Sequence, residues 1–200
     1  MRGTAFEFDV FISHAWDPDD AGRDNHARAK RLNARLQSLG LKTWFDDERT
    51  EGLNLKRMAE GIEGSVVSLV CVTRRYMEKV SESAGNNCKF EFEYALNKRT
   101  TLNMLPVVME ASMTDTSRWN GTLGMVLGRV IYHKLTSDDD AEFDHAVTAI
   151  AAAIRKKVEK LLPNELQAAA GAASVARDRR RASWRACNKL VRLLRVSGVG

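Results

Sequence analysis

The sequence predicts an α/β domain built on a doubly wound, five-stranded parallel sheet. Short runs rich in β-forming residues alternate with helix-patterned segments from residue 6 to residue 162, and such alternation is typical of parallel sheets with right-handed crossovers. One of these runs, Ser65 to Thr73, is apolar on both faces in its middle. That pattern favours a central strand covered by helices on each side.

Local patterns place the elements before this central strand. Phe8 to Ser13 is rich in β formers and predicts the first strand. Leu32, Leu36 and Leu39 recur at helical spacing, and Gly40 stands where a helix end favours a left-handed residue. The expected elements are a strand at 8–13, a helix that Asp24 or Asn25 caps and that ends at Gly40, a strand at 42–45, and a short helix at 55–63.

The elements after the central strand are predicted in the same way. They are a helix at 88–98, a strand at 104–109, a short strand at 130–132, and a last helix that Ser137 or Asp138 caps and that Pro163 follows. Because Pro106 has no backbone N–H, we expect it at the start of the fourth strand or at an edge of the sheet. Ligands bind such sheets beyond the carboxyl ends of the strands. These ends are the loops after residues 13, 45, 73 and 109.

The formal net charge of +5 belongs to the end of the chain. Residues 177–200 carry eight Lys or Arg and one acid, which leaves 23 bases and 25 acids before them. We therefore expect one domain at 6–162 that does not bind nucleic acid, followed by an Ala-rich linker and a basic amphipathic tail at 163–200. Such a tail suits an acidic membrane surface or the groove of a partner, and the alternative is that its apolar face folds back on the domain.

Several classes of protein are disfavoured by what the sequence lacks. Three scattered cysteines and four scattered histidines predict neither a disulfide framework nor a metal site. The chain has no GxGxxG and no GxxxxGKS/T motif, so neither dinucleotide oxidoreduction nor phosphoryl transfer is expected. It also has no signal-peptide pattern and no apolar run near the ~20 residues that span a bilayer, so we expect a cytoplasmic protein.

Four segments resemble the Toll/interleukin receptor (TIR) domain in their order and spacing. They are FDVFISHAW at 8–16, LKTWFDDE at 41–48, IEGSVVSLVCVT at 62–73, and CKFEFEYAL at 88–96 with LPVVME at 105–110. GRDNHAR at 22–28 resembles a version found in TIR proteins of unicellular eukaryotes. The resemblance implies a flavodoxin-like sheet and signalling through association with other TIR domains. It also implies that the loop Asp46–Leu53, which matches the family's BB loop, mediates self-association.

Members of the TIR family have one of two kinds of function, and the resemblance leaves both open. Some members are non-catalytic adaptors, whereas others cleave the bond between nicotinamide and ribose in NAD+. The second group uses a glutamate in a C-x-x-E pattern followed by A-L, which points to Glu91 after Cys88. Counting back from Pro106 favours Glu93 instead. Two positions along a helix are a rotation of about 200°, so only one of these acids can face the crevice, and the helix register favours Glu91.

One carboxylate is chemically sufficient for this cleavage. Ordinary glycosidases need a second carboxyl group as a general acid, because their leaving oxygen departs as an alkoxide. Nicotinamide leaves as a neutral molecule, because its ring nitrogen already bears the positive charge, and a fixed anion then stabilises the cationic ribose. NAD+ would be a substrate, and no cofactor is needed. The alternative for Glu91 is an exposed acid that stabilises the helix dipole.

Two residues after the first strand could serve the rest of the dinucleotide. Trp16 could stack on a base, and Arg23 could meet phosphate. The alternatives are a partly buried loop aromatic and a surface arginine. Some TIR enzymes carry one or two arginines just after the first strand, where this chain has Ala15 and Trp16. A flavodoxin-like response regulator shares the topology but needs an acidic cluster and a downstream lysine at strand ends, which we do not find.

Overall fold

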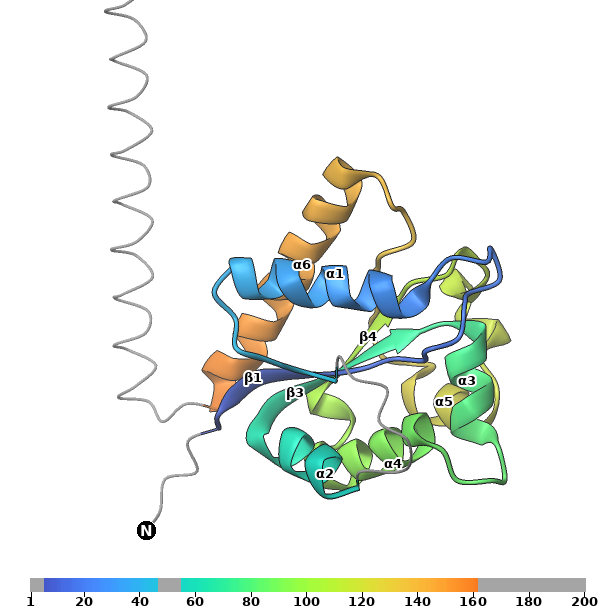
Figure 1. Ribbon diagram of the computed structural model, residues 1–200. Helices are drawn as coiled ribbons and strands as arrows, with labels where there is room; N and C mark the ends of the chain where they lie inside the picture. Colours follow the sequence, from blue (N-terminus) through green and yellow to red (C-terminus); the bar gives the residue numbers. More distant parts are fainter. Residues whose placement is uncertain (1–5, 47–54, 162–200) are drawn as a thin grey trace, which may run out of the picture. The chain divides into compact units, whose positions relative to one another are not determined.

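The computed structural model describes residues 6–46 and 55–161, which form a five-stranded parallel sheet between two layers of helices (Figure 1). The predicted fold class is confirmed. The sheet order is β2-β1-β3-β4-β5, and the strands are β1 (Phe8–Ser13), β2 (Thr43–Phe45), β3 (Ser65–Val72), β4 (Met104–Val108) and β5 (His133–Lys134). The central strand β3 is buried along its whole length, as its apolar run predicts.

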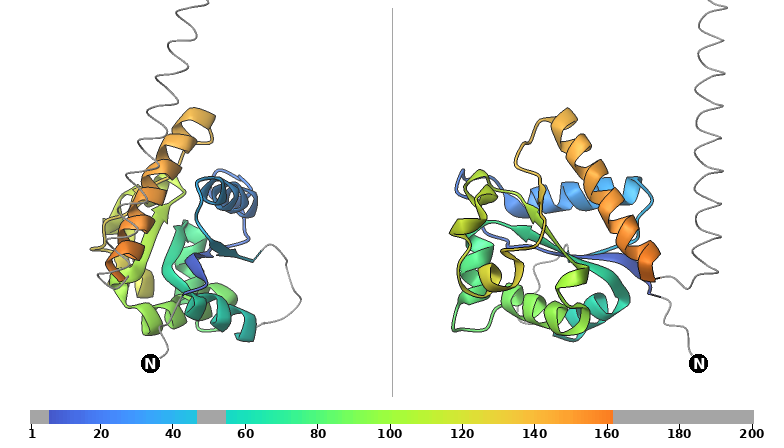
Figure 2. Two further views of the ribbon diagram at one scale, coloured as in Figure 1. Left: turned by 90° about the vertical axis from the view of Figure 1, so that its left-hand side faces the viewer. Right: turned by 180° about the vertical axis from the view of Figure 1, so that it is seen from behind.

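The helices divide between the two faces of the sheet, as the views in Figures 1 and 2 show. What we call the α1/α6 face is covered by α1 (Asn25–Ser38) and α6 (Asp140–Leu161). What we call the α2–α5 face is covered by α2 (Leu55–Gly64), α3 (Arg74–Ser81), α4 (Asn87–Arg99) and α5 (Gly121–Leu127). Three short 3₁₀ helices complete the described elements: η1 (Thr101–Asn103), η2 (Ala111–Thr114) and η3 (Thr116–Arg118).

Strand alternation assigns each side chain of β1 to one face. Val10 and Ile12 pack in the core of the α1/α6 face, and Phe11 packs in the core of the α2–α5 face. Because every second residue of a strand points to the same side, Ser13 shares the side of Phe11. The last residue of β1 thus places a hydroxyl group under α3 and α4.

The first helix begins and ends where its sequence predicts. The Asp24 side chain accepts a hydrogen bond from the Ala27 N–H at 2.9 Å, which caps α1. Gly40 has φ +87°, a left-handed conformation that glycine adopts without strain. These two local signals fix α1 against the sheet, and they position the β1–α1 loop above the carboxyl ends of the strands.

Two helices of the structure are absent from the sequence prediction. In α3, the Thr73 side chain accepts from the Tyr76 N–H at 3.1 Å, and Tyr76, Met77 and Val80 are buried. The segment is only eight residues long, too short for a clear periodic signal. The second is α5, a seven-residue helix that contains two glycines. Because α3 directly follows β3, the segment predicted at 88–98 is the second helix after that strand.

The last strand lies further along the chain than predicted. The prediction of residues 130–132 is wrong, and β5 is His133–Lys134. The Val130 N–H bonds to the Leu127 carbonyl in the turn after α5, and Ile131 is 86% exposed. These β-forming residues therefore belong to a surface turn, which their local pattern does not reveal.

Pro106 lies in the middle of β4, between β3 and β5, so the expectation of a strand start or a sheet edge is wrong. Met109 N–H donates to Val72 of β3, and Val108 O accepts from Leu135 beyond β5. Because backbone groups alternate in direction along a strand, Pro106 faces the β5 side. The pairing with β5 begins only at Val107, so the missing N–H of Pro106 costs no ladder hydrogen bond.

The cap of α6 also differs from the prediction. The Asp139 carboxylate accepts from the N–H groups of Ala141 and Glu142, both at 3.0 Å, so neither Ser137 nor Asp138 is the cap. Asp138 instead accepts from Arg28 of α1 at 2.7 Å. Three segments lie outside the described residues: residues 1–5, the loop segment 47–54, and the tail 162–200, which includes Pro163.

Candidate active site

Helix α4 presents Glu91 to the sheet as part of its buried stripe. Asn86 caps the helix by accepting from the Lys89 N–H at 3.0 Å. The buried residues recur at the i, i+3, i+4, i+7 spacing of a helix that packs on a core: Cys88, Glu91, Phe92 and Ala95. Glu91 therefore occupies a position that an apolar residue normally fills.

The Glu91 carboxyl group contacts the last residue of β1. Ser13 Oγ donates to Glu91 Oε2 at 2.6 Å, and Ser13 Oγ also lies 2.7 Å from Tyr76 Oη of α3. The exposed fractions are 8% for Glu91, 3% for Ser13 and 0% for Tyr76. Glu93, two positions on, is only half-buried. The structure thus turns Glu91 toward the carboxyl end of β1, while its catalytic role stays a prediction.

Burial raises the pKa of Glu91 to about 8, because desolvation penalises the charged carboxylate. The hydrogen bond from Ser13 opposes this rise, and the negative charge of Asp46, just after β2, adds to it. Among the described residues, no cation shifts this pKa. Glu91 therefore holds its proton near pH 7 and gains most from a positive charge brought close to it.

A cluster of four rings lies at the carboxyl ends of β1 and β2. Trp16 stacks on His26 with centroids 3.6 Å apart, and His14 stacks on Phe45 at 5.0 Å. His14 Nε2 and His26 Nδ1 are 2.8 Å apart, and burial lowers the pKa of His14 to about 3, with a further contribution from His26. The thiol of Cys88 contacts the His14 carbonyl at 3.6 Å. The cluster therefore adjoins α4 one turn before Glu91, and Trp16 is a partly buried ring within it.

Arg23 lies near the carboxyl ends of β4 and β5, and hydrogen bonds to side chains and carbonyl groups hold it there. Its guanidinium donates to Asp19 at 2.7 Å and to Asp138 at 3.0 Å. It also donates to the carbonyls of Thr136 at 2.8 Å and Met109 at 3.1 Å. Arg23 thus ties the β1–α1 loop to the carboxyl ends of β4 and β5. A phosphate would have to displace these partners, so the predicted phosphate contact is not brought together with Glu91.

Three acids of the β1–α1 loop, Asp17, Asp19 and Asp20, have basic partners, whereas Glu91 has none among the described residues. Asp17 pairs with Lys79, and Asp20 pairs with Arg74. For Asp19, burial alone would raise the pKa, yet hydrogen bonds and charge from Arg23 hold it below its ordinary value. In the part of the chain that the structure describes, no group of three or more His, Cys, Asp or Glu side chains is arranged to hold a metal ion.

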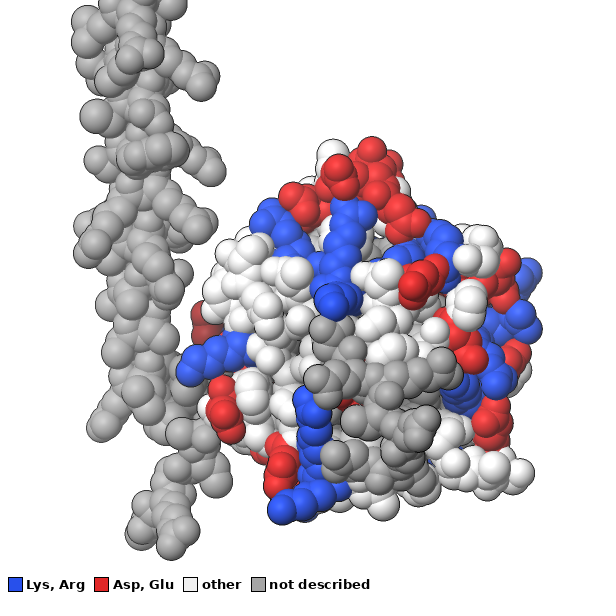
Figure 3. All heavy atoms as spheres, in the orientation of Figure 1, with Lys and Arg blue, Asp and Glu red and all other residues white. Residues whose placement is uncertain are grey.

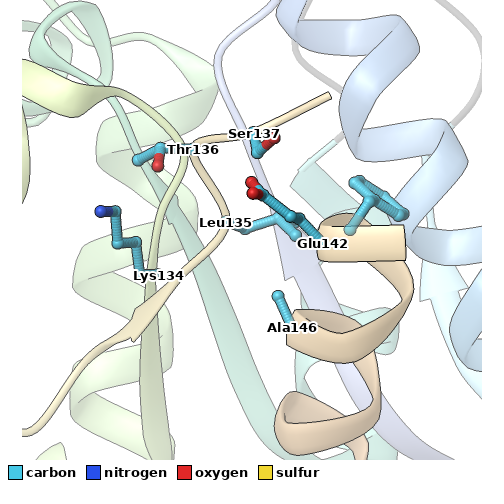
Figure 4. A pocket seen from close by; sticks show the side chains of 7 residues that line it. Lys134, Leu135, Thr136, Ser137, Glu142 and Ala146 are labelled. Carbon is cyan, nitrogen blue, oxygen red and sulfur yellow. The ribbon is translucent and has the colours of Figure 1, made fainter. Parts of the chain in front are cut away.

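Three hollows lined by described residues lie away from Glu91. One, of about 180 Å³, lies between the end of β5 and the first turns of α6; in Figure 4 the Glu142 carboxyl group points toward Ser137, while Lys134 points to the opposite side. The second, of about 250 Å³, is an apolar hollow between α2 and α4. Its lining residues are Leu55, Met58, Ala59, Ile62, Phe90 and Tyr94. The third, of about 280 Å³, lies beside α3, and its lining residues are Arg74, Met77, Glu78, Ser112, Met113, Arg118 and Asn120.

Sequence reasoning missed the residues that surround Glu91. Ser13 is a polar residue on the inward side of a buried strand, a signal that was available. Tyr76 follows the helix cap Thr73 by three positions, which is a weaker local signal. Asp46 comes together with Glu91 only through the sheet order, which places β2 beside β1. That last contact has no signature in the sequence near either residue.

The comparisons with known proteins agree with this architecture. The family model of the TIR domain matches residues 10–148. A solved structure of a metazoan TIR-STING receptor from C. gigas, in complex with 2',3'-cGAMP, is similar with a TM-score of 0.52 and 17% identity. The match covers 76% of this chain and 41% of that receptor chain, so this chain spans less than half of the receptor. No curated protein matches the sequence. No helix within residues 6–46 and 55–161 has the length and apolarity to cross a membrane.

Proposed function

This chain belongs to the TIR domain family, and from that premise we propose that it is a signalling protein that cleaves NAD+ to nicotinamide and ADP-ribose, with Glu91 as the catalytic carboxylate. One observation carries the proposal. The Glu91 carboxyl group is buried at the carboxyl end of β1 in hydrogen-bond contact with Ser13, and no cation of residues 6–46 or 55–161 pairs with it. Strongly perturbed acids of this kind concentrate at functional sites. Within the family, the closer resemblance of residues 22–28 to TIR proteins of unicellular eukaryotes stays a prediction.

The chemistry of NAD+ supplies the charge that Glu91 lacks. The bond between the ribose carbon and the nicotinamide nitrogen breaks with its electron pair leaving on the nitrogen. Water then adds to the ribose carbon and releases a proton. Positive charge moves from the nicotinamide ring to the ribose during this step, and a carboxylate in a low-dielectric site stabilises it more strongly than one in water. Bound NAD+ therefore favours the ionised form of Glu91.

The ring cluster supports binding of the nicotinamide end. Planar rings at the carboxyl ends of β1 and β2 offer a surface on which another flat ring can stack. Because the pKa of His14 is lowered to about 3, His14 is neutral near pH 7 and does not repel the cationic nicotinamide ring. Glu91 is only 8% exposed, so side chains around it must rearrange to admit the ribose. If association with a second TIR domain drives that rearrangement, cleavage rises steeply with protein concentration.

Nicotinamide release from NAD+ by the concentrated whole chain tests this proposal. Glu91→Gln removes the charge and keeps the shape, whereas Glu93→Gln makes the same change two positions away. We expect release by the wild type, a loss of at least about 100-fold in Glu91→Gln, and wild-type release in Glu93→Gln. No release from the concentrated wild type, or release that Glu91→Gln leaves unchanged, would contradict the proposal.

The second candidate function is that of a non-catalytic TIR adaptor. The observation that favours it is the burial of Glu91, which leaves an uncharged group with little access near pH 7. In that case Glu91→Gln and wild type associate equally and neither releases nicotinamide. Sedimentation of the two proteins at matched concentrations, run beside the nicotinamide assay, separates the two functions. The predicted association surface, the loop Asp46–Leu53, lies outside the described residues apart from Asp46.

A further inference from the structure

Two hydroxyl groups connect Glu91 to the helix that precedes its own. Tyr76 Oη of α3, Ser13 Oγ of β1 and Glu91 Oε2 of α4 form a chain with separations of 2.7 Å and 2.6 Å. The three groups come from three elements and all are buried. Ser13 thus lies between a phenol and a carboxyl group, with little contact with water.

Proton counting fixes the direction of this chain when Glu91 is ionised. A serine hydroxyl has one proton to donate, and Ser13 donates it to Glu91. The oxygen of Ser13 must then accept from Tyr76. The Tyr76 phenol keeps its proton for this bond, since burial first, and then neighbouring ionisable groups, raise its pKa well above the ordinary value. Donors linked in series polarise each other, so the second hydroxyl strengthens the bond that the first one makes.

We propose that Ser13 and Tyr76 are positioning residues for Glu91, which hold its carboxyl group in one orientation and donate to it through this chain of two hydroxyls. The inference rests on the proposed function, in which the ionised carboxyl group acts on the ribose. Burial alone favours the neutral form of Glu91, and without a directed hydrogen bond the carboxyl group has a broad choice of orientation about its last torsion. The chain opposes both effects, because hydrogen bonds to a charged acceptor are stronger than those to a neutral one.

The other ionisable groups around Glu91 do not perform this task. Asp46, after β2, raises the pKa of Glu91 by its negative charge. Cys71 on β3 and Cys88 on α4 itself are thiols whose pKa burial raises to about 12, so both are neutral where Glu91 titrates. The hydroxyl chain is therefore the described feature that favours the charged form of Glu91.

Three substitutions and one control isolate the contribution of the hydroxyl chain from Tyr76 through Ser13 to Glu91. Ser13→Ala removes the direct donor, Ser13→Thr keeps a hydroxyl, and Tyr76→Phe removes a single oxygen from a side chain that otherwise packs unchanged. The control is Ser68→Ala. Ser68 is a buried serine of β3, in register with Phe11 of β1, and its hydroxyl has no hydrogen-bond partner in the described part of the chain.

The first readout is the titration of the Glu91 side-chain carboxyl group, followed by ¹³C NMR in the whole chain and assigned with Glu91→Gln. We expect Ser13→Ala to move the midpoint upward by about one to two pH units. Tyr76→Phe should move it in the same direction by about a few tenths of a unit. Ser13→Thr and Ser68→Ala should keep the wild-type midpoint. Unshifted or lowered midpoints in both Ser13→Ala and Tyr76→Phe would overturn the inference.

The second readout is the pH profile of nicotinamide release. If the chain acts through Glu91, Ser13→Ala loses kcat/KM at pH 7 in proportion to the shift, about tenfold per unit, and recovers toward the wild-type rate at high pH. A general structural defect would lower the rate at every pH. If the wild type releases no nicotinamide, only the proposed function is contradicted, because the titration still decides whether the hydroxyl chain acts on Glu91. Release that needs Glu91, with an unshifted titration in Ser13→Ala, sinks only the positioning role.

Discussion

The two faces of the sheet both carry exposed ion pairs, such as Lys98 with Glu63 on the α2–α5 face, but they differ in the ionisable group that they bury. On the α1/α6 face, bases of α1 meet acids of α6 at the rim, with Arg31 and Asp140 at 2.6 Å and Arg35 and Asp144 at 2.9 Å. Acidic and basic side chains accordingly lie side by side over α1 and the start of α6 (Figure 3). On the α2–α5 face, Glu91 is buried with a hydroxyl donor, Ser13, and no cation in the described part of the chain shifts its pKa.

The exposed ion pairs and the buried Glu91 differ in their effect on the stability of the fold. Exposed ion pairs contribute little either way, about 0–1 kcal/mol each. A buried acid without a cation lowers stability whenever it is ionised. An apolar residue at position 91 would pack on the core without that cost. The α2–α5 face therefore carries the group for which stability offers no explanation, and there a function is the better one.

The largest expected effect is a gain in stability when Glu91 is changed to Gln. The pKa of Glu91 is about 8 in the fold and 4.5 without it, so the folded state binds the proton more tightly. The unfolding free energy of the wild type should fall as the pH rises from about 4.5 to about 8, by an amount on the order of 4 kcal/mol. Glu91→Gln lacks this loss, so it should be the more stable protein at pH 8.5. Urea unfolding at pH 4.5 and pH 8.5 checks this, and parallel pH dependence of the two proteins would refute it.

In Arg28→Ala, the unfolding free energy should fall by about 2–4 kcal/mol. Among the described basic residues of the α1/α6 face, Arg28 is the buried one. Its side chain is 8% exposed, and its guanidinium donates to Asp138 at 2.7 Å, to the Met109 carbonyl at 2.9 Å and to the Leu135 carbonyl at 3.0 Å. The substitution removes the donor to the Leu135 carbonyl and one of the two arginine donors to Asp138 and to the Met109 carbonyl, which Arg23 still contacts. Thermal and urea unfolding measure the change. An effect as small as that of an exposed arginine would mean that water replaces Arg28 at no cost.

A smaller effect, on titration rather than on stability, is expected for Asp46→Asn. Removing its negative charge should lower the pKa of Glu91, by less than about one unit, because Asp46 contributes less than burial does. The ¹³C titration of Glu91 should therefore move in the direction opposite to that of Ser13→Ala. An upward shift would show that Asp46 acts on Glu91 in some way other than through its charge.

The smallest effect belongs to the exposed pairs of the rim. Arg35→Gln should change the unfolding free energy by less than about 1 kcal/mol, and the change should shrink further in 0.5 M salt. The partner change, Asp144→Asn, should behave alike. A loss comparable to that of Arg28→Ala would erase the distinction between the rim and the buried site, and with it the contrast between the two faces.

Residue spacing along the sequence predicts those features that depend on a single helix or strand. The ends of α1 are correct because Asp24 and Gly40 act on their own helix, and β3 is correct because its burial is continuous along the chain. The choice of Glu91 over Glu93 as the inward-facing acid belongs to the same class, since helix geometry alone separates two positions by about 200°.

The rest could not be predicted because it depends on contacts between distant segments. Tyr76 and Ser13 meet across 63 positions, and Ser13 and Glu91 across 78. Pro106 is tolerated in an inner strand because its neighbour begins one residue later, which only the register shows. Residues 130–132 are β-forming in composition, yet the turn after α5 removes them from the sheet. Arg23 is a surface arginine by local pattern, but the fold commits it to four partners.

The most direct test of the central claim is the pH dependence of kcat/KM for nicotinamide release by the concentrated whole chain, with Glu91→Gln measured in parallel. If Glu91 is the buried carboxylate that acts on the ribose, kcat/KM of the wild type rises about tenfold per pH unit up to pH 8 and then levels off, and Glu91→Gln stays inactive throughout. A flat profile between pH 5 and pH 9, or a Glu91→Gln protein that cleaves NAD+ as the wild type does, would contradict the claim.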